Sequence, residues 1–159
     1  MNAAHWHLLL NHFPITGNYF STFILIIGIL IKNQSVKNTG FSLFILTALI
    51  AIPVLFTGDG AKDVLTSIGQ KNEFYIHRHE KLAENAFWLS ISIGIFSLGA
   101  LIGRRNKKQT RILTITILIA GLGNSVLMTA AGNAGGQIRH TEIRPVNQLQ
   151  NENSIGDVK

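Results

Sequence analysis

Four apolar runs constrain this chain more than any other feature of its sequence. They cover residues 15–31, 40–57, 86–102 and 112–131. Each run is about 17–20 residues long, close to the length that an α-helix needs to cross the hydrocarbon core of a bilayer. Backbone polar groups in lipid must be satisfied within the protein, so such runs form helices. Because the connections are short, the sequence predicts an all-α, transmembrane four-helix up-down bundle.

The composition agrees with a single membrane domain. Apolar residues make up 47% of the chain and charged residues only 14%, against roughly 25% charged residues in a soluble domain. The absence of cysteine excludes disulfides, thiolate metal sites and covalently attached c-type haem. In a soluble protein the net charge of +6 would suggest nucleic acid as a partner. Here the basic residues are concentrated in short loops, so we expect a lipid bilayer as partner and no nucleic acid.

Shorter segments precede and follow the four runs. Residues 2–13 form a short amphipathic segment, and Pro14 predicts a break near Phe13, since the residue before a proline disfavours the α conformation. Residues 145–159 are polar, and we expect a disordered tail after a transmembrane domain of residues 1–144. The sequence contains no evident internal repeat.

Glycines predict where several helices stop. The sequence Thr-Gly-Asp-Gly at residues 57–60 predicts the end of the second span. Asp59 would then be the N-cap of a short surface helix between spans 2 and 3, which Gly69 ends. Glu73 begins the long helix that contains the third span, and Asn-Ala-Gly-Gly at residues 133–136 predicts a break after the fourth.

The distribution of charge predicts the orientation in the membrane. The loops on one side carry only basic residues, namely Lys32, Lys37, Arg104, Arg105, Lys107, Lys108 and Arg111. All acidic residues lie on the other side, namely Asp59, Asp63, Glu73, Glu80, Glu84, Glu142, Glu152 and Asp157. The positive-inside rule therefore predicts a multi-pass protein of a bacterial inner membrane, with both termini and every histidine on the periplasmic side.

The histidines predict a metal site. All six lie beside the ends of apolar runs, namely His5, His7, His12, His77, His79 and His140, and imidazole binds iron, copper and zinc. His79 shares a helix face with Ala83 and Ala86, and small residues let membrane helices approach closely. We therefore expect His79 to point into the bundle and the two alanines to leave room for a cofactor. His77, about 200° away around the helix, is either a further ligand or a solvated residue.

Haem b is the cofactor that this pattern favours. A second imidazole would come from another histidine, and His12 is favoured by its position at the mouth of the first run. His140 follows two glycines that allow close packing against a cofactor. Arg139 and Arg144 lie near His140, and arginine is well suited to pair with the carboxylates of haem propionates.

These residues predict a b-type cytochrome-like electron-transfer protein, with one haem b near the periplasmic face and enough histidines for a second. Its partners would be quinol or a larger respiratory complex and a periplasmic electron carrier, and self-association into a homo-oligomer is compatible with the sequence. One alternative is a haem-free site for Cu, Zn or non-haem Fe that uses Glu73, Glu80 and Glu84. Quinone binding with Asp63, or a cofactor-free accessory subunit, are the others.

Short motifs also resemble a known family. They are His12-Phe13-Pro14-Ile15, Gly58-Asp59, the region of His79, and Gly135-Gly136 followed by Ile138. In these the chain is similar, over about residues 5–143, to a four-span bacterial membrane family known as domain of unknown function 2231. The resemblance implies a small membrane protein suspected of binding haem or of serving redox complexes. The chain differs from the family in having His140 where a tyrosine is usual, which adds a potential ligand.

Overall fold

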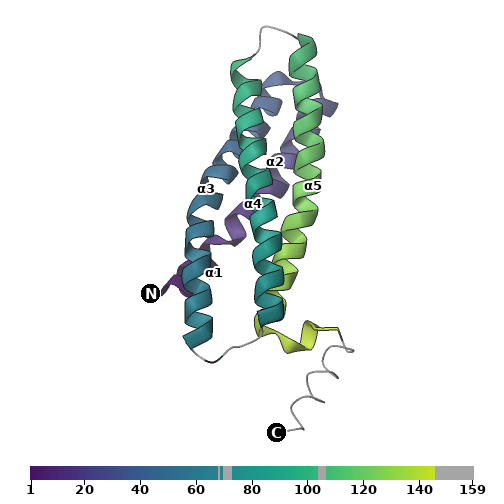
Figure 1. Cartoon of the computed structure of the whole chain (residues 1–159). Coiled ribbons are helices and arrows are strands. Elements are labelled where there is room, and N and C mark those ends of the chain that lie inside the picture. The colour runs from purple at the N-terminus through teal and green to yellow at the C-terminus, as the bar shows by residue number, and fades with distance from the viewer. Residues whose placement is uncertain (68, 70–72, 104–106, 146–159) are drawn as a thin grey trace.

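The chain folds into a long helical bundle (Figure 1). A computed structural model describes residues 1–67, 69, 73–103 and 107–145. Within these ranges lie α1 (Ala3–Leu10), α2 (His12–Leu30), α3 (Gln34–Ser67), α4 (Glu73–Ile102), α5 (Lys107–Arg139) and the short 3-10 helix η1 (Thr141–Ile143), and no strand. Four helical stretches are long and apolar enough to cross a membrane, and α1 and α2 together form the first. The predicted all-α four-helix bundle is confirmed, with the helix lengths of a multi-pass membrane protein.

Helices that are consecutive in sequence are neighbours in the bundle. α2 packs on α3, α3 on α4 and α4 on α5, and α2 also packs on α5, which closes the ring. α1 packs mainly against α3. As a result α1, the last turns of α3, the first turns of α4 and the last turns of α5 lie at the same end, the lower end in Figure 1. We refer to it as the histidine end.

The first crossing is interrupted between α1 and α2. α1 ends at Leu10, and the backbone N–H of Asn11 donates to the carbonyl of His7 at 2.9 Å. α2 begins at His12, and Pro14 lies in its first turn, where a missing N–H costs no helical hydrogen bond. The predicted break is therefore present, but it lies just before His12.

Two helix ends predicted from glycines are wrong. α3 continues through residues 57–60, so no separate surface helix follows the second span and Asp59 is not an N-cap. α5 likewise continues through residues 133–136. Gly69, with a φ of +79°, lies just beyond the end of α3, as expected of a residue that stops a helix. The predicted tail, residues 145–159, lies outside the described residues from 146 onward.

The glycines within these helices allow close approach between helices. A Cβ atom added at Gly60 would lie 2.6 Å from the Cβ of Ala3, so glycine lets α1 lie directly on α3. A Cβ added at Gly94 would lie 2.7 Å from the Cβ of Ala48, where α4 crosses α3. Because a helix in lipid cannot give up backbone hydrogen bonds, glycine in these positions changes the packing and leaves the helix intact.

The interior of the bundle contains many polar side chains, whereas large apolar side chains lie on its outer surface. Buried hydroxyl and amide side chains line the inward faces, namely Asn18, Ser21, Thr22, Thr47, Ser90, Ser97, Thr114, Asn124 and Ser125. Large apolar side chains such as Phe20, Phe23, Ile95, Ile119 and Val126 are exposed on the outside. An apolar exterior suits contact with lipid. Away from the histidine end, the interior is filled by an apolar cluster that includes Leu25, Phe41, Phe44, Ile93 and Ile117.

Two asparagines join three helices near the middle of the bundle. The Asn18 amide of α2 donates to the Gly121 carbonyl at 3.1 Å and to Ser125 Oγ at 2.8 Å, both in α5. The Asn124 amide donates to Asn18 Oδ1 at 3.2 Å and to Ser90 Oγ of α4 at 2.9 Å. Hydrogen bonds between membrane helices average about 0.6 kcal/mol each, so the set contributes mainly by fixing how the helices are rotated.

Substitution of Gly94 by alanine is expected to destabilise the bundle. The new Cβ would meet the Ala48 Cβ, which cannot move without its backbone, so we expect a loss of about 1–3 kcal/mol in the free energy of unfolding. Gly99→Ala, on the same helix, is the control. Its added Cβ would have its nearest neighbour at 3.9 Å, and alanine favours helix by up to about 1 kcal/mol. Unfolding in mixed micelles measures the stability of both variants. Equal stabilities would contradict the close packing of Gly94 on Ala48.

Candidate functional site

Two histidines from separate helices approach each other inside the histidine end. The ring centroids of His7, in α1, and His79, in α4, are 6.2 Å apart, and their planes are nearly perpendicular, at 85°. Both side chains are half-buried. Of the six predicted ligands, the structure brings these two together.

The His7 ring is held by the backbone of α3. Its Nδ1 lies 3.2 Å from the Val54 carbonyl and 3.3 Å from Thr57 Oγ1. The Thr57 hydroxyl proton is directed at the carbonyls of Pro53 and Val54, each at 3.0 Å. Because a carbonyl only accepts, the proton of a neutral His7 ring lies on Nδ1, and Nε2 keeps a free lone pair.

The His79 ring is held in the same manner by α5. Its Nδ1 lies 2.8 Å from the Ala131 carbonyl, so Nδ1 is again the donor and Nε2 again the acceptor. A hydrogen bond from the second ring nitrogen to a carbonyl is typical of metal-ligating histidines, because it fixes the tautomer and the orientation of the ring. Both histidines of the pair therefore have the tautomer that a metal requires.

A glycine lies beside each of the two rings. A Cβ added at Gly58 would lie 3.5 Å from His7 Cε1, and one added at Gly135 would lie 3.0 Å from His79 Nδ1. Each glycine comes four residues after the residue whose carbonyl binds the ring, Val54 in α3 and Ala131 in α5. The missing side chain leaves that carbonyl accessible to an imidazole from the neighbouring helix.

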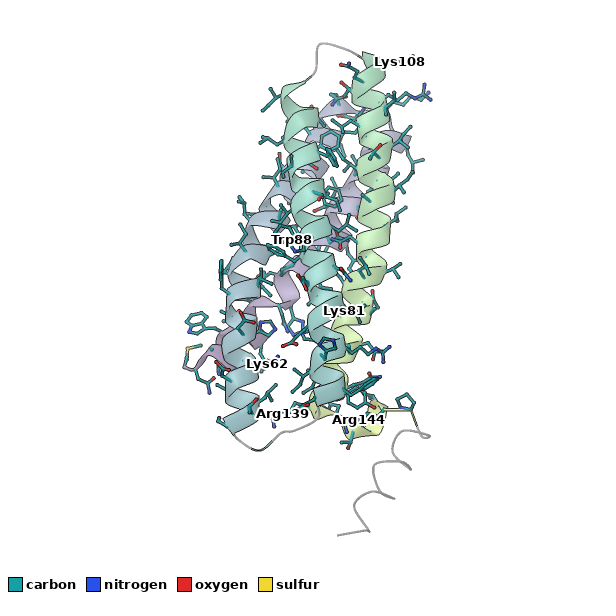
Figure 2. All side chains as sticks on the ribbon, viewed as in Figure 1. Lys62, Lys81, Trp88, Lys108, Arg139 and Arg144 are labelled. Carbon is teal, nitrogen blue, oxygen red and sulfur yellow. The ribbon has the colours of Figure 1, made fainter. Side chains whose placement is uncertain are left out.

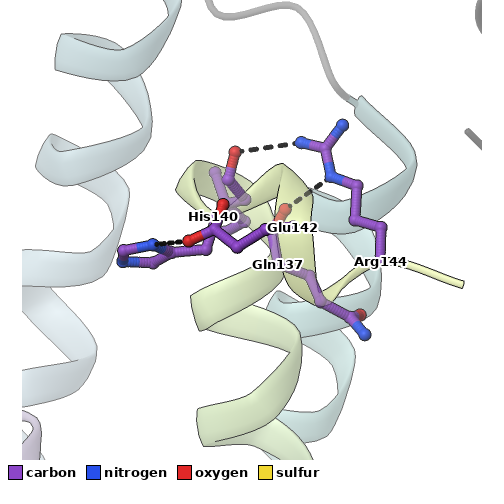
Figure 3. A network of polar contacts seen from close by, with 5 residues as sticks. Gln137, His140, Glu142 and Arg144 are labelled. Carbon is purple, nitrogen blue, oxygen red and sulfur yellow. Dashed lines mark hydrogen bonds and ion pairs between the residues drawn. The ribbon is translucent and has the colours of Figure 1, made fainter.

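The other four histidines lie away from this pair. His5, His12 and His77 are exposed, and His77 Nδ1 lies 4.0 Å from Glu80. His140 Nδ1 lies 2.8 Å from Glu142 on the surface after α5 (Figure 3). The backbone N–H of Glu142, followed by the His140 ring, lowers the pKa of the Glu142 carboxyl. Sequence reasoning favoured His12 for the first helix, whereas the structure turns His7 toward His79.

The predicted cofactor-binding arginines and alanines occupy different surroundings. Arg144 is buried, and its guanidinium lies 4.5 Å from the centre of the Tyr75 ring. Its Nε donates to the Gln137 carbonyl at 2.8 Å, at the C-terminal end of α5 (Figure 3). Arg139 is exposed, Ala83 is half-buried and Ala86 is buried on the inward face of α4. Arg144 therefore caps a helix end, as cations near helix C-termini do.

The donor set of the site consists of two imidazoles. Among the residues that the structure describes, no three His, Cys, Asp or Glu side chains are grouped closely enough to hold a metal ion. The histidine pair itself was within reach of sequence reasoning, since both residues were candidates. The carbonyls that accept from the two rings, and the close approach of His7 to Gly58, could not be predicted from the sequence, because no side-chain pattern identifies a backbone acceptor.

Comparisons of the chain with protein-family models, curated proteins and solved structures found no match. The resemblance to the domain-of-unknown-function 2231 family, which rests on short motifs, therefore stays a prediction.

Substitution of Gly135 by alanine is expected to displace the His79 ring. The added Cβ would lie 3.0–3.1 Å from Nδ1 and Cε1 of that ring, so the ring must rotate and its bond to Ala131 weakens. Gly132→Ala is the control, because its nearest neighbour would be Ile15 at an ordinary 3.7 Å. Imidazole NMR should show a shifted His79 Nδ1–H resonance in the first variant only. Equal shifts in both variants would contradict the proposed contact.

Proposed function

We propose that this chain is a b-type cytochrome-like membrane protein that binds haem b through His7 and His79. The observation that carries the proposal is the pair of half-buried imidazoles from α1 and α4, each with Nδ1 bonded to a backbone carbonyl. Each Nε2 then keeps a lone pair for a metal centre. The hydrogen bonds also raise the basicity of the rings, which strengthens them as ligands of ferric iron.

The spacing of the rings fits two ligands of one iron. Metal–imidazole bonds are about 2.0–2.1 Å long, as for zinc, so two imidazoles that bind one metal would have ring centres on the order of 6 Å apart or less. The observed separation is 6.2 Å. Between the rings and the neighbouring helices, Gly58 and Gly135 contribute no side chain.

The number of ligands favours haem over a bare metal ion. A zinc site needs three or four protein ligands, whereas haem iron is bound by four porphyrin nitrogens and needs only one or two from the protein. Within the described ranges the two histidines have no third donor grouped with them. Two protein ligands are enough for haem iron. Haem b would supply a one-electron couple, and the two histidines would hold its iron, with their rings oriented by the carbonyls of Val54 and Ala131.

The orientation of the site supports a role for periplasmic partners. The junction of α2 and α3 and the start of α5, with Lys108, lie at the opposite end of the bundle from the histidine pair, so the positive-inside rule supports a site near the periplasmic face of a bacterial inner membrane. A haem at that depth would accept electrons from quinol or from a larger respiratory complex and pass them to a periplasmic carrier.

Absorption spectroscopy of the detergent-purified protein tests haem binding. We expect sharp α and Soret bands on reduction. His7→Ala and His79→Ala should each lower haem occupancy at least about tenfold, because even changes to groups that only orient a metal ligand cost about 10–100-fold. His77→Ala, on the same helix as His79 but exposed, should leave the bands unchanged.

Other outcomes would contradict the proposal. A folded protein that stays colourless with added haem would exclude it. Stoichiometric Cu, Zn or non-haem Fe in such a preparation would instead support a haem-free metal site. Full tolerance of alanine at all six histidines would support an accessory subunit without cofactor.

Reporter fusions test the orientation. Alkaline phosphatase fused to the C-terminus should be active, because it would be exported, whereas the same enzyme fused after Gly103, in the basic loop region, should be inactive. Green fluorescent protein at the two points should give the opposite pattern. Activity of the phosphatase only at Gly103 would place the histidine end on the cytoplasmic side.

A further inference from the structure

An ion pair joins α3 and α4 next to the positions that hold the two histidine rings. Lys62 Nζ lies 2.8 Å from Glu80 Oε1, and both side chains are partly exposed. Lys62 is one helical turn beyond Gly58, beside which the His7 ring lies, and Glu80 directly follows His79. Because residues four apart share a helix face, Lys62 lies on the same face of α3 as Gly58, and Figure 2 shows it in the lower part of the bundle, toward the histidine end.

We propose that Lys62 pairs with a carboxylate of the ligand held by His7 and His79, and that Glu80 occupies the place of that carboxylate in the ligand-free chain. This inference rests on the proposed function, in which the ligand is haem b and the carboxylates are its propionates. The lysine ammonium is a compact charge with three rotatable donors. It can therefore exchange one carboxylate for another while the helices stay in place.

The arginines predicted for this role are placed less favourably. The Arg144 guanidinium is engaged by the carbonyls of Gln137 and Ile138 and by the Tyr75 ring. Arg139 is the exposed last residue of α5. Figure 2 shows both arginines closer to the tip of the histidine end than Lys62. Lys62 is thus the better placed cation for a carboxylate that extends outward from the rings.

The charges around Lys62 make the inference testable. Asp59 and Asp63 of α3 and Glu80 of α4 all act on the ammonium, and the second oxygen of Glu80 lies 4.0 Å from His77 Nδ1. Three carboxylates around one ammonium oppose the approach of another carboxylate. Neutralising Glu80 removes a competitor and part of this repulsion, whereas neutralising Lys62 leaves the repulsion unbalanced. The two members of one ion pair should therefore affect ligand binding in opposite directions.

The experiment is a haem titration of the full-length protein purified in detergent from haem-deficient cells. We expect Lys62→Gln to weaken haem binding about two- to fivefold and Glu80→Gln to strengthen it by a similar factor, effects of the size that partly exposed charge pairs produce. Lys81→Gln, an equal loss of charge at an exposed position of α4, should change little. With haem dimethyl ester, which has no propionate charge, Lys62→Gln and wild type should bind alike.

Three results separate the inference from the proposed function. If wild type binds no haem, both are overturned. If wild type binds haem through His7 and His79 but Lys62→Gln and Glu80→Gln shift the affinity in the same direction, the ion pair is structural and only the inference is overturned. Only the inference is also overturned if Lys62→Gln weakens binding of the dimethyl ester as much as binding of haem itself. Opposite shifts that vanish with the ester support the assignment of Lys62.

Discussion

The structure depends on the need of every polar group in a lipid-facing bundle to find a partner within the protein. Helices satisfy their own backbone groups, but imidazoles and carboxamides must use atoms of neighbouring helices. His7 and His79 use backbone carbonyls of α3 and α5. Asn18 and Asn124 use each other and α5. Polar groups without partners are costly in lipid. The hydrogen bonds that these side chains make to neighbouring helices therefore also fix their orientation.

The two halves of the bundle repeat this arrangement. His7 and His79 are 72 positions apart, and so are Asn18 and Ser90, which both receive a hydrogen bond from Asn124. The carbonyls that hold the rings, and the glycines beside them, are both 77 positions apart. These equal spacings relate α1–α2 with α3 to α4 with α5. Each half contributes one imidazole to the pair.

Sequence reasoning reached the fold more easily than the site. Apolar runs of membrane-spanning length allow few alternatives to helices, so the four spans followed from hydropathy alone. The inward direction of His79 followed from the small residues on its face. The sequence did not predict that His7, and not His12, lies beside His79. The break at Asn11 separates the helix of His7 from the helix of His12.

The two errors at glycines have a single physical cause. In water, Thr-Gly-Asp-Gly or Asn-Ala-Gly-Gly can end a helix because solvent satisfies the released backbone groups. Here α3 and α5 continue through both motifs, and Gly58, Gly60 and Gly135 pack against side chains of neighbouring helices. The glycines instead expose carbonyls on the helix surface, and Gly58 and Gly135 are where the two imidazoles reach them. Motifs that indicate turns in a soluble protein here mark the positions at which one helix accepts a side chain from another.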